Sequence, residues 1–360
     1  MSDATVQVNV DDHQVFPSPI WTFILPMQDE IVHDAMKIFF YEVYEEERVC
    51  LARMLPQGWQ ADFIASTPQE AGHAVPPAPH ISIRTQSLIP ANWLHDVSSI
   101  ISRSTGYDHL VALKRLTPKP GAALSCLPKY CGQAVAEHAL MLWMALARKL
   151  RAQLSSIQSF NRDGLTGSEL KGRRLVVAGV GDIGYRVVAI GQALGMQVYG
   201  VDPEPRHEAL RYVSLAEGLA MADILVCAMN LTENNRGLFS IEQWRRAKPG
   251  LLFVNVSRGE CSPFQDLLLA LNEGWLGGVG LDVFNHEAEF ARLLRTGVPA
   301  DSQELSAARE LLQHPQVLFT PHNAFNTQEA TERKCALTID QFKAFESCGQ
   351  FLHQPPALSW

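Results

Sequence analysis

The stretch RRLVVAGVGDIGYRVVAIGQALGMQVYGVD, residues 173–202, predicts a strand, a glycine-rich turn, a helix and a second strand of a parallel α/β sheet. A run typical of a buried strand, LVVAGV, leads into the pattern Gly179-x-Gly181-x-x-Gly184, and an apolar helix follows. A second strand pattern, QVYGV, ends at Asp202, 18 residues after Gly184. A glycine pattern alone is a weak signal, but the strand, helix and terminal acid around this one predict dinucleotide binding.

Each part of the motif has a mechanical role in holding a dinucleotide. The first glycine permits a tight turn, the second lets the backbone approach a pyrophosphate, and the third lets helix and strand pack closely. The pyrophosphate then meets the helix N-terminus. Asp202 can hydrogen-bond both ribose hydroxyls and repels a 2′-phosphate, so the sequence favours NAD over NADP. The cofactor-binding residues predicted here are Gly179, Gly181, Asp182, Ile183, Gly184 and Asp202.

Composition and charge narrow the class of protein. The 360 residues are enough for two domains, and 47% hydrophobic with 19% charged residues is ordinary for a globular protein. A net charge of −8 argues against nucleic acid as the main partner, because phosphate binding needs a basic surface. The sequence contains no run of about 18 apolar residues, so we expect no membrane span.

The cysteines and the N-terminus indicate a cytoplasmic protein. The seven cysteines form an odd set without CxxC spacing, so we expect reduced thiols and no metal site. The opening residues, MSDATVQVNVDDHQ, are polar and acidic and show no apolar core of a secretory signal. The first 35 residues carry no pattern to which we can assign a structure or a role.

Short apolar runs before the glycine motif predict a parallel sheet with helical crossovers, because strands and helices alternate there. The predicted strands are KIFFYEV (37–43), QADFIAS (60–66), HISIRTQ (80–86) and SSIISRSTG (98–106), and EEERVCLARML (45–55) is predicted as a helix. The segment TPKPGAALSCLPKY (117–130) is rich in proline and glycine and has no hydrophobic period, so we expect a linker.

The helix predicted at AVAEHALMLWMALARKL (134–150) is hydrophobic on all sides, because every residue from Ala139 to Ala147 is apolar. Such a helix must be buried on more than one side, against another domain or another subunit. We therefore expect a homodimer formed through this part of the chain. His138 is expected to make a helix-terminal hydrogen bond.

Three motifs downstream of the glycine loop form a recognisable order. Arg258 stands in NVSRGE after the strand LLFV, Asp282 and Glu287 stand in GGVGLDVFNHE, and His322 stands in FTPHNAF. This order of Arg, Asp-x4-Glu and Pro-His on a dinucleotide-binding domain resembles the NAD-dependent D-2-hydroxyacid dehydrogenases. The resemblance runs from about residue 37 to about residue 345 and includes ISRSTGYDHL (101–110).

The resemblance implies that His322 is the acid–base residue, Glu287 its partner and Arg258 the substrate-binding arginine. The chemistry supports these roles independently. Reduction of a 2-oxoacid needs a hydride, a proton for the carbonyl oxygen and a cation for the carboxylate, which arginine can grip with two N–H groups. A histidine paired with a carboxylate is kept protonated near neutral pH and held in one orientation.

Further residues are implied to contact the cofactor. Asp282 would bond the nicotinamide carboxamide or ribose, and the other residues bordering the cofactor would be Met229, Asn230, Asn235, Val256 and Ser257. A purely structural role stays open for three of these residues. The alternatives are that Arg258 is a surface ion-pair residue, that Glu287 is a solvated acid and that Asp282 caps the end of a strand.

Two features resemble the D-lactate dehydrogenase-like subgroup. Tyr130 matches a substrate-contacting tyrosine of lactate-type members, with a buried anchor as the alternative reading. The segment between Glu287 and His322 is long and holds the helical pattern ELSAARELLQH. Arg84, in RTQS (84–87), stands where the family's backbone amides meet the substrate carboxylate, and it adds a second cation there. Ala288 and Asn230 depart from the family, because proline is common at both positions.

The predicted fold is two Rossmann-like or flavodoxin-like α/β domains, each with a parallel sheet, and an active-site cleft between them. Residues 1–128 and 323–360 would form the substrate domain, and 129–322 the NAD-binding domain. The segment NTQEATERKCALTIDQFKAF (326–345) is predicted as a helix with Asn326 as N-cap and Glu329 completing a capping box.

The predicted function is hydride transfer between NAD(H) and a small 2-oxoacid or D-2-hydroxyacid, with His322 as general acid and base. Glyoxylate or hydroxypyruvate reduction and phosphite oxidation are alternatives on the same scaffold. A protein of a different class, an NAD-sensing regulator, is a further alternative. The expected partner is a small molecule, and neither nucleic acid nor membrane.

Overall fold

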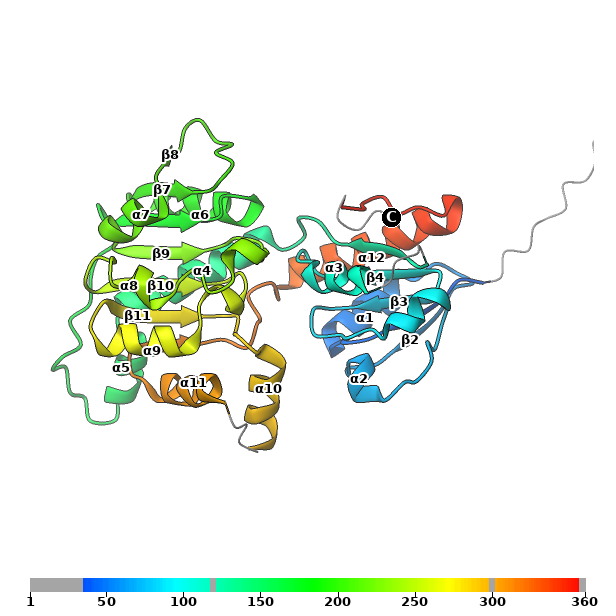
Figure 1. The fold of residues 1–360 in the computed structure, drawn as a ribbon, viewed down its shortest axis with the longest axis horizontal. Coiled ribbons are helices and arrows are strands. Elements are labelled where there is room, and N and C mark those ends of the chain that lie inside the picture. Colours follow the sequence, from blue (N-terminus) through cyan, green and yellow to red (C-terminus); the bar gives the residue numbers. More distant parts are fainter. Residues whose placement is uncertain (1–34, 117–120, 298–301, 356–360) are drawn as a thin grey trace, which may run out of the picture. The chain divides into compact units, whose positions relative to one another are not determined.

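The computed structural model describes residues 35–116, 121–297 and 302–355, so the first 34 residues lie outside the description. The described part contains a five-stranded sheet, ordered β2-β1-β3-β4-β5, and a seven-stranded sheet, ordered β12-β11-β10-β9-β6-β7-β8 (Figure 1). All pairings in both sheets are parallel. The prediction of two parallel α/β sheets is confirmed.

The smaller sheet is formed by the short apolar runs near the start of the chain. Its strands are β1 (Lys37–Phe40), β2 (Gln60–Phe63), β3 (His80–Ile83), β4 (Ser99–Ser102) and β5 (Ala123–Cys126). The helical segments beside them are α1 (Glu45–Met54), α2 (Pro68–Ala71), η1 (Ala91–His95) and α3 (Asp108–Arg115). The last helix of the chain, α12 (Gln328–Cys348), packs against α1. The predicted strands and the predicted first helix are all present.

The linker predicted at 117–130 was wrong in its central part. Residues 117–120 lie outside the described ranges, but β5 follows and pairs in parallel with β4 at the edge of the sheet. Leu124, Ser125 and Cys126 are buried. Composition averaged over the whole segment concealed this strand, because prolines and glycine flank a run of only four strand residues.

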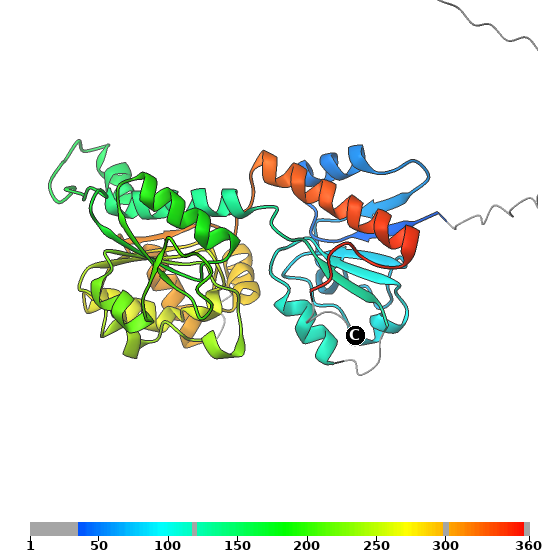
Figure 2. The ribbon, with the colours of Figure 1, turned by 90° about the horizontal axis from the view of Figure 1, so that it is seen from above.

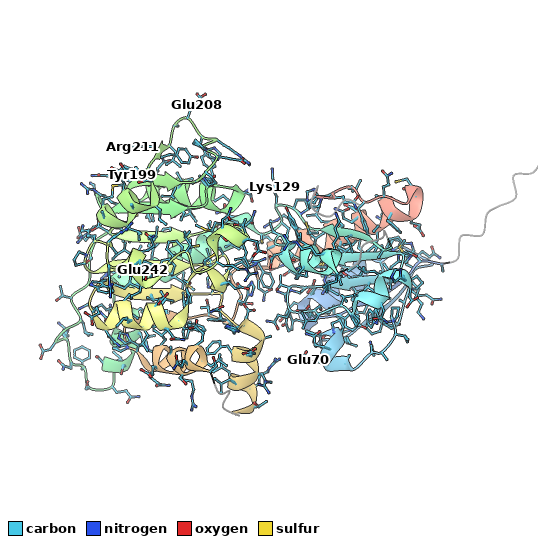
Figure 3. The ribbon with its side chains drawn as sticks, viewed as in Figure 1. Glu70, Lys129, Tyr199, Glu208, Arg211 and Glu242 are labelled. Atoms are coloured by element: carbon cyan, nitrogen blue, oxygen red, sulfur yellow. The ribbon has the colours of Figure 1, made fainter. Side chains whose placement is uncertain are left out.

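The larger sheet places the glycine motif at its topological switch point, where the strand order reverses between β6 and β9. Its strands are β6 (Arg174–Ala178), β7 (Gln197–Val201), β8 (Arg211–Tyr212), β9 (Ile224–Cys227), β10 (Leu251–Asn255), β11 (Leu276–Leu281) and β12 (Val317–Phe319). At the β8 edge the Arg211 guanidinium lies 5.7 Å from the centre of the Tyr199 ring (Figure 3).

Helices cover both faces of the larger sheet (Figure 2). One face packs α4 (Gly132–Ala147) and α6 (Asp182–Ala193) on strand residues such as Val177 and Val254. The opposite face packs α7 (Leu215–Met221), α8 (Ile241–Trp244), α9 (Phe264–Asn272) and α11 (Gln303–Gln313) on Val176 and Phe253. Successive strand residues therefore point to opposite faces, as a doubly covered parallel sheet requires.

The chain itself buries most of the apolar helix α4. Leu142 and Trp143 are almost fully buried, and the helix packs against α6, β10 and β11. The inference that its apolar surface requires another domain or subunit was wrong for most of that surface. Met141, 47% exposed, is the large hydrophobic side chain of α4 that stays open to solvent in the described structure.

The helix predicted at 326–345 is confirmed as α12, but its cap differs. Thr327 is the N-cap, and its side-chain oxygen accepts a hydrogen bond from the Ala330 N–H at 3.2 Å. Asn326 instead closes the preceding turn, where its N–H donates to the Asn323 carbonyl. The third helical position is then Ala330 and not Glu329, so the predicted capping box is lost.

No helix in the described ranges is both long and apolar enough to cross a membrane.

A buried carboxylate joins elements on one side of the larger sheet. Glu304, on α11, accepts hydrogen bonds from the Phe264 N–H at 2.5 Å and the Gln265 N–H at 3.3 Å. These N–H groups begin α9, whose N-cap Pro263 has no side-chain acceptor of its own. Glu304 also accepts a hydrogen bond from Asn285 Nδ2 at 2.9 Å, in the loop before α10 (Glu287–Thr296).

We predict that Glu304→Ala lowers the free energy of unfolding by roughly 1–3 kcal/mol, because buried donors lose their acceptor. Glu310→Ala is the matched control, because Glu310 lies exposed on the same helix. The control should stay within about 0.5 kcal/mol of the wild type. Denaturant unfolding of both variants measures the difference, and equal midpoints would contradict the capping role of Glu304.

Candidate active site

His322 and Glu287 form a hydrogen-bonded pair at the carboxyl ends of neighbouring strands. Nδ1 of His322 lies 2.8 Å from Oε1 and 2.9 Å from Oε2 of Glu287. His322 follows β12 by three residues, and Glu287 is the first residue of α10, shortly after β11. Because β11 and β12 are parallel neighbours, their carboxyl ends bring the two side chains together.

Asp282 fixes the turn that presents His322. Its carboxylate, 1% exposed, accepts hydrogen bonds from Thr320 Oγ1 at 2.7 Å, the Asn323 N–H at 2.8 Å and the Ala324 N–H at 2.9 Å. His322 has a φ of +49°, a left-handed conformation uncommon for residues other than glycine and costing of order 1 kcal/mol or more. Asp282 therefore holds the catalytic candidate in a backbone conformation that it would otherwise rarely adopt.

His138, in α4, contacts the residues that hold this turn. Its Nε2 lies 2.8 Å from Thr320 Oγ1 and 3.5 Å from Asp282 Oδ1. The prediction of a helix-terminal hydrogen bond for His138 was wrong. The residue lies in the second turn of α4 and reaches across to the end of β12.

Gln86 contributes a second donor to Glu287. Its Nε2 donates to Glu287 Oε1 at 2.8 Å from the segment after β3. Burial alone would raise the pKa of Glu287, but the positive charge of His322 and the hydrogen bonds from His322 and Gln86 outweigh it. The pKa of Glu287 therefore lies below its ordinary value, and the residue is a partly buried carboxylate and not a solvated acid.

Arg258 lies at the carboxyl end of β10 and is oriented by several contacts. Its Nε and Nη2 donate to Asp108 Oδ1 at 3.1 Å each, and its Nη1 donates to the Ser257 carbonyl at 2.8 Å. A Cβ placed on Gly106 would lie 1.5 Å from Arg258 Nη2, so the guanidinium rests directly against that glycine. With 19% of its side chain exposed, Arg258 is not a surface ion-pair residue.

His322, Asp282 and Arg258 line one cavity of about 90 Å³ together with much of the predicted cofactor site. The predicted site residues lining it are Arg84, Tyr130, Ile183, Met229, Asn230, Val256, Ser257, Arg258, Asp282 and His322. Glu287 reaches the cavity through His322. Tyr130 is buried, and its hydroxyl donates to the Arg103 carbonyl at 3.4 Å, so it is both a cavity residue and an anchor.

The glycine turn has the shape that the motif predicts. Gly179 has a φ of +87°, and a Cβ there would lie 2.6 Å from Met229 Cα. A Cβ on Gly184 would lie 1.9 Å from the Gly179 carbonyl oxygen, whereas one on Gly181 would meet nothing within 4 Å. The first and third glycines are therefore required by packing, and the second faces open space at the start of α6.

The remaining predicted cofactor residues lie outside the cavity. Gly181 and Asp182 line a neighbouring groove. Asp202 follows β7 and accepts a hydrogen bond from the Val180 N–H at 2.7 Å, beside the glycine turn. Asn235 closes the turn after β9, with its Nδ2 donating to the Asn230 carbonyl at 2.7 Å.

Sequence analysis missed Gln86, Asp108 and Gly106 as parts of the site. Gly106 and Asp108 stand within ISRSTGYDHL, a stretch that supported the family resemblance without a role for either residue. Arg258 contacts Asp108 across 150 residues of sequence, and Glu287 contacts Gln86 across 201. The available signals were the position of Asp108 in that stretch and the position of Gln86 in RTQS (84–87), where only Arg84 was given a role.

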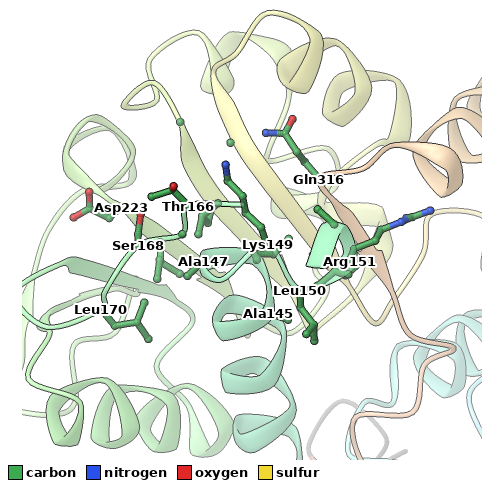
Figure 4. Close-up of a pocket in the computed structure, with 18 of the residues that line it drawn as sticks. Ala145, Ala147, Lys149, Leu150, Arg151, Thr166, Ser168, Leu170, Asp223 and Gln316 are labelled. Carbon is green, nitrogen blue, oxygen red and sulfur yellow. The ribbon is translucent and has the colours of Figure 1, made fainter. Parts of the chain in front are cut away.

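A separate pocket of about 350 Å³ lies at the opposite end of the larger sheet (Figure 4). Arg173, Asp223 and Gln316, which line it, stand just before β6, β9 and β12. Its cations are engaged, since Arg151 donates to the Val317 and Leu312 carbonyls and Lys149 to the Gly164 carbonyl. Ligands of open parallel sheets bind at the carboxyl ends of the strands. The cavity at His322, and not this pocket, is therefore the candidate active site.

Comparison with known proteins identifies the family. A family model described as the NAD-binding domain of D-isomer-specific 2-hydroxyacid dehydrogenases matches residues 140–324. A 2-hydroxyacid dehydrogenase A from Aspergillus oryzae is 30% identical over 70% of this chain and 73% of its own. A D-lactate dehydrogenase from Escherichia coli is 31% identical over 70% of this chain and 77% of its own.

A solved structure shares the fold over most of its length. The D-lactate dehydrogenase from Aquifex aeolicus, crystallised with NAD and lactic acid, aligns with a TM-score of 0.75 and 26% identity. The alignment covers 88% of this chain and 99% of that one.

We predict that Gly106→Ala lowers kcat/KM for 2-oxoacids by about 10²-fold, because Arg258 must move away from the new methyl group. Only the end of a flexible side chain is displaced, so the melting temperature and NADH affinity should stay near those of the wild type. Steady-state kinetics, thermal unfolding and NADH titration of the variant provide the measurements. Full activity would show that catalysis does not require Arg258 to lie against Gly106.

Proposed function

This chain belongs to the D-isomer-specific 2-hydroxyacid dehydrogenases, NAD-dependent enzymes, and from that premise we propose that it reduces a 2-oxoacid in the cavity at His322. The observation that carries the proposal is that His322, hydrogen-bonded to Glu287, lines one cavity with Arg258. When bound, NADH supplies the hydride. The residues of the chain supply the proton, the grip on the substrate and the geometry.

The residues at the glycine turn fit a dinucleotide. Gly181 leaves open space where a pyrophosphate would approach the start of α6. Asp202 lies at the end of β7 beside this turn, in position for the ribose hydroxyls. Val256, Ser257 and Asp282 line the same cavity. We assign these three residues to the nicotinamide end of the cofactor.

His322 is proposed as the proton donor in reduction. Its Nδ1 is bound to Glu287, so Nε2 is the nitrogen free to deliver a proton to the carbonyl oxygen. Glu287 stays ionised because its pKa is lowered, and its negative charge stabilises the protonated ring. In the reverse direction the neutral histidine takes the hydroxyl proton.

Arg258 is proposed to hold the substrate carboxylate. A guanidinium has five N–H groups. Three of those on Arg258 donate to Asp108 and to the Ser257 carbonyl, which leaves two for a carboxylate. Asp108 therefore fixes the plane of the guanidinium without saturating it. Tyr130 and Arg84 complete the substrate side of the cavity.

We assign residues 1–128 and 323–360 to the substrate domain and 129–322 to the NAD-binding domain. All strands of the smaller sheet fall within residues 1–128, and α12, from residues 323–360, packs against α1. Every strand of the larger sheet falls within residues 129–322. On this assignment the described part of each domain has its own parallel sheet.

We further propose a cytoplasmic homodimer. α5 (Leu150–Ser156) and the turn after it expose Leu150, Leu154, Ile157 and Phe160, and each is at least 43% exposed. An exposed apolar surface of this kind is suited to a second copy of the chain. The cytoplasmic location is supported by the unpaired thiols of all seven cysteines.

The assay that tests the function is NADH consumption with a panel of 2-oxoacids, for the wild type and for His322→Asn. Asparagine is chosen because it tolerates the left-handed backbone at position 322. We expect turnover by the wild type and a loss of about 10²- to 10⁴-fold in the variant, which lacks the proton donor. NADH binding should survive the substitution. A wild type that binds NADH but reduces no 2-oxoacid would favour a regulatory, NAD-sensing protein.

Removal of the charge on Glu287 should alter the pH dependence of the reaction. In Glu287→Gln the protonated histidine loses its anionic partner, so the pH at which reduction declines should move downward. Oxidation needs the neutral histidine, so its rise should move to lower pH as well. A profile displaced by one pH unit corresponds to about 1.4 kcal/mol of lost stabilisation of the protonated ring. At neutral pH, reduction should suffer more than oxidation.

The measurement is kcat/KM against pH in both directions. Glu289→Gln is the control, because Glu289 lies on the same helix with 55% of its side chain exposed, and its profiles should match the wild type. Unmoved profiles in Glu287→Gln would remove Glu287 from the mechanism.

A further inference from the structure

Arg84 is a cation on the cavity wall without a hydrogen-bond partner for its side chain in the described structure. Its Nε is fully buried and unpaired, and no carboxylate of the described residues lies within 4 Å of its guanidinium. The hydrogen bond that Arg84 makes comes from its backbone N–H, which donates to Glu42 Oε2 at 2.9 Å. An unpaired buried polar group destabilises the folded chain, so a ligand that supplies the missing partner is favoured.

The neighbouring buried cations are satisfied by the chain itself. Arg103, fully buried, donates to Glu47 Oε1 at 2.8 Å, to Ser82 Oγ at 2.9 Å and to the Tyr41 carbonyl at 2.7 Å. Lys334 Nζ lies 3.0 Å from Glu47 Oε2. Glu47 thus pairs with both Arg103 and Lys334. It acts on Arg84 only by electrostatic attraction at a longer distance. Arg84 therefore differs from both, because its side chain has neither an ion pair nor a hydrogen bond in the described structure.

Aromatic rings orient the Arg84 guanidinium. Its central carbon lies 4.3 Å from the centre of the Phe325 ring and 5.4 Å from that of Tyr44. Phe325 follows His322 by three residues and lines the same cavity. The aromatic faces leave the edge of the guanidinium, which carries its N–H groups, as the part available to an anion.

The cavity therefore holds two cations from different elements. Arg258, at the end of β10, has its own carboxylate in Asp108 and keeps two N–H groups for the carboxylate next to the reacting carbonyl. Arg84, at the end of β3, has no such partner. A substrate with a single carboxylate would satisfy one of these cations and leave the other unpaired.

We propose that the substrate is a 2-oxoacid carrying a second carboxylate, and that Arg84 binds this second group. The inference rests on the proposed function, in which Arg258 binds the first carboxylate. Arg84 then determines specificity and takes no part in the proton or hydride transfer. The competing arrangement is that Arg84 shares the only carboxylate of a monocarboxylic substrate with Arg258.

Matched substrates distinguish the two arrangements. Oxaloacetate is compared with 2-oxobutyrate, and 2-oxoglutarate with 2-oxovalerate, since each pair has the same chain length and differs in the second carboxylate. For the wild type we expect kcat/KM to favour the dicarboxylic member of at least one pair by about tenfold or more, the worth of a charge-assisted hydrogen bond.

Arg84→Gln should lower the ratio of kcat/KM for the dicarboxylic substrate to kcat/KM for its monocarboxylic match by about tenfold or more. An NADH affinity and a melting temperature near those of the wild type would show that the variant is folded. Arg84→Lys, which keeps the charge, should retain part of the preference. Arg53→Gln is the control and should leave the ratio unchanged, because Arg53 is exposed on α1, with 64% of its side chain accessible.

Two results would overturn the proposal while leaving the dehydrogenase function intact. One is a wild type that reduces monocarboxylic 2-oxoacids with no preference for either dicarboxylic substrate. The other is an Arg84→Gln variant that loses both classes equally, which would place Arg84 on the shared carboxylate. If neither class is reduced although NADH binds, the proposed function itself fails and this inference falls with it.

Discussion

The carboxylate of Asp282 is the fixed point around which the site is arranged. It is buried at the end of β11, and it receives its hydrogen bonds from the segment that follows β12. The position of His322 thus follows from the register of two neighbouring strands, together with three short hydrogen bonds. Glu287 approaches from the same strand end as Asp282. The proposed acid–base pair is consequently built from the carboxyl ends of two neighbouring strands.

Two groups of the site, His322 and Arg258, each have a carboxylate partner, and the two carboxylates come from different parts of the chain. Glu287 partners His322, and Asp108 partners Arg258. Burial raises the energy of an isolated charge steeply, so such pairing is what allows several charged groups to share a small cavity. The pairing also keeps each cation in one orientation before any substrate arrives, which lowers the reorganisation needed for the reaction.

The sequence predicted those parts of the structure whose physics is local. The glycine turn, the strands around it and the acid after β7 are specified within one stretch, and the motif residues lie where parallel strands end. The strand β5 escaped prediction because it is short and lies between prolines. Asp108 and Gln86 were not assigned because their roles exist only when distant strands are brought together. The N-cap of α12 was misplaced by one residue, since Asn326 and Thr327 are both good caps and the preceding turn decides between them.

The left-handed backbone at His322 restricts what can replace it in the course of evolution. Asparagine and glycine adopt that conformation at low cost, whereas most other residues would strain the turn that Asp282 holds. A lineage that exchanges this histidine for asparagine would lose the proposed proton donor and keep the scaffold, the glycine turn and Arg258. A ligand-binding protein without that proton donor is therefore a single substitution away from this sequence.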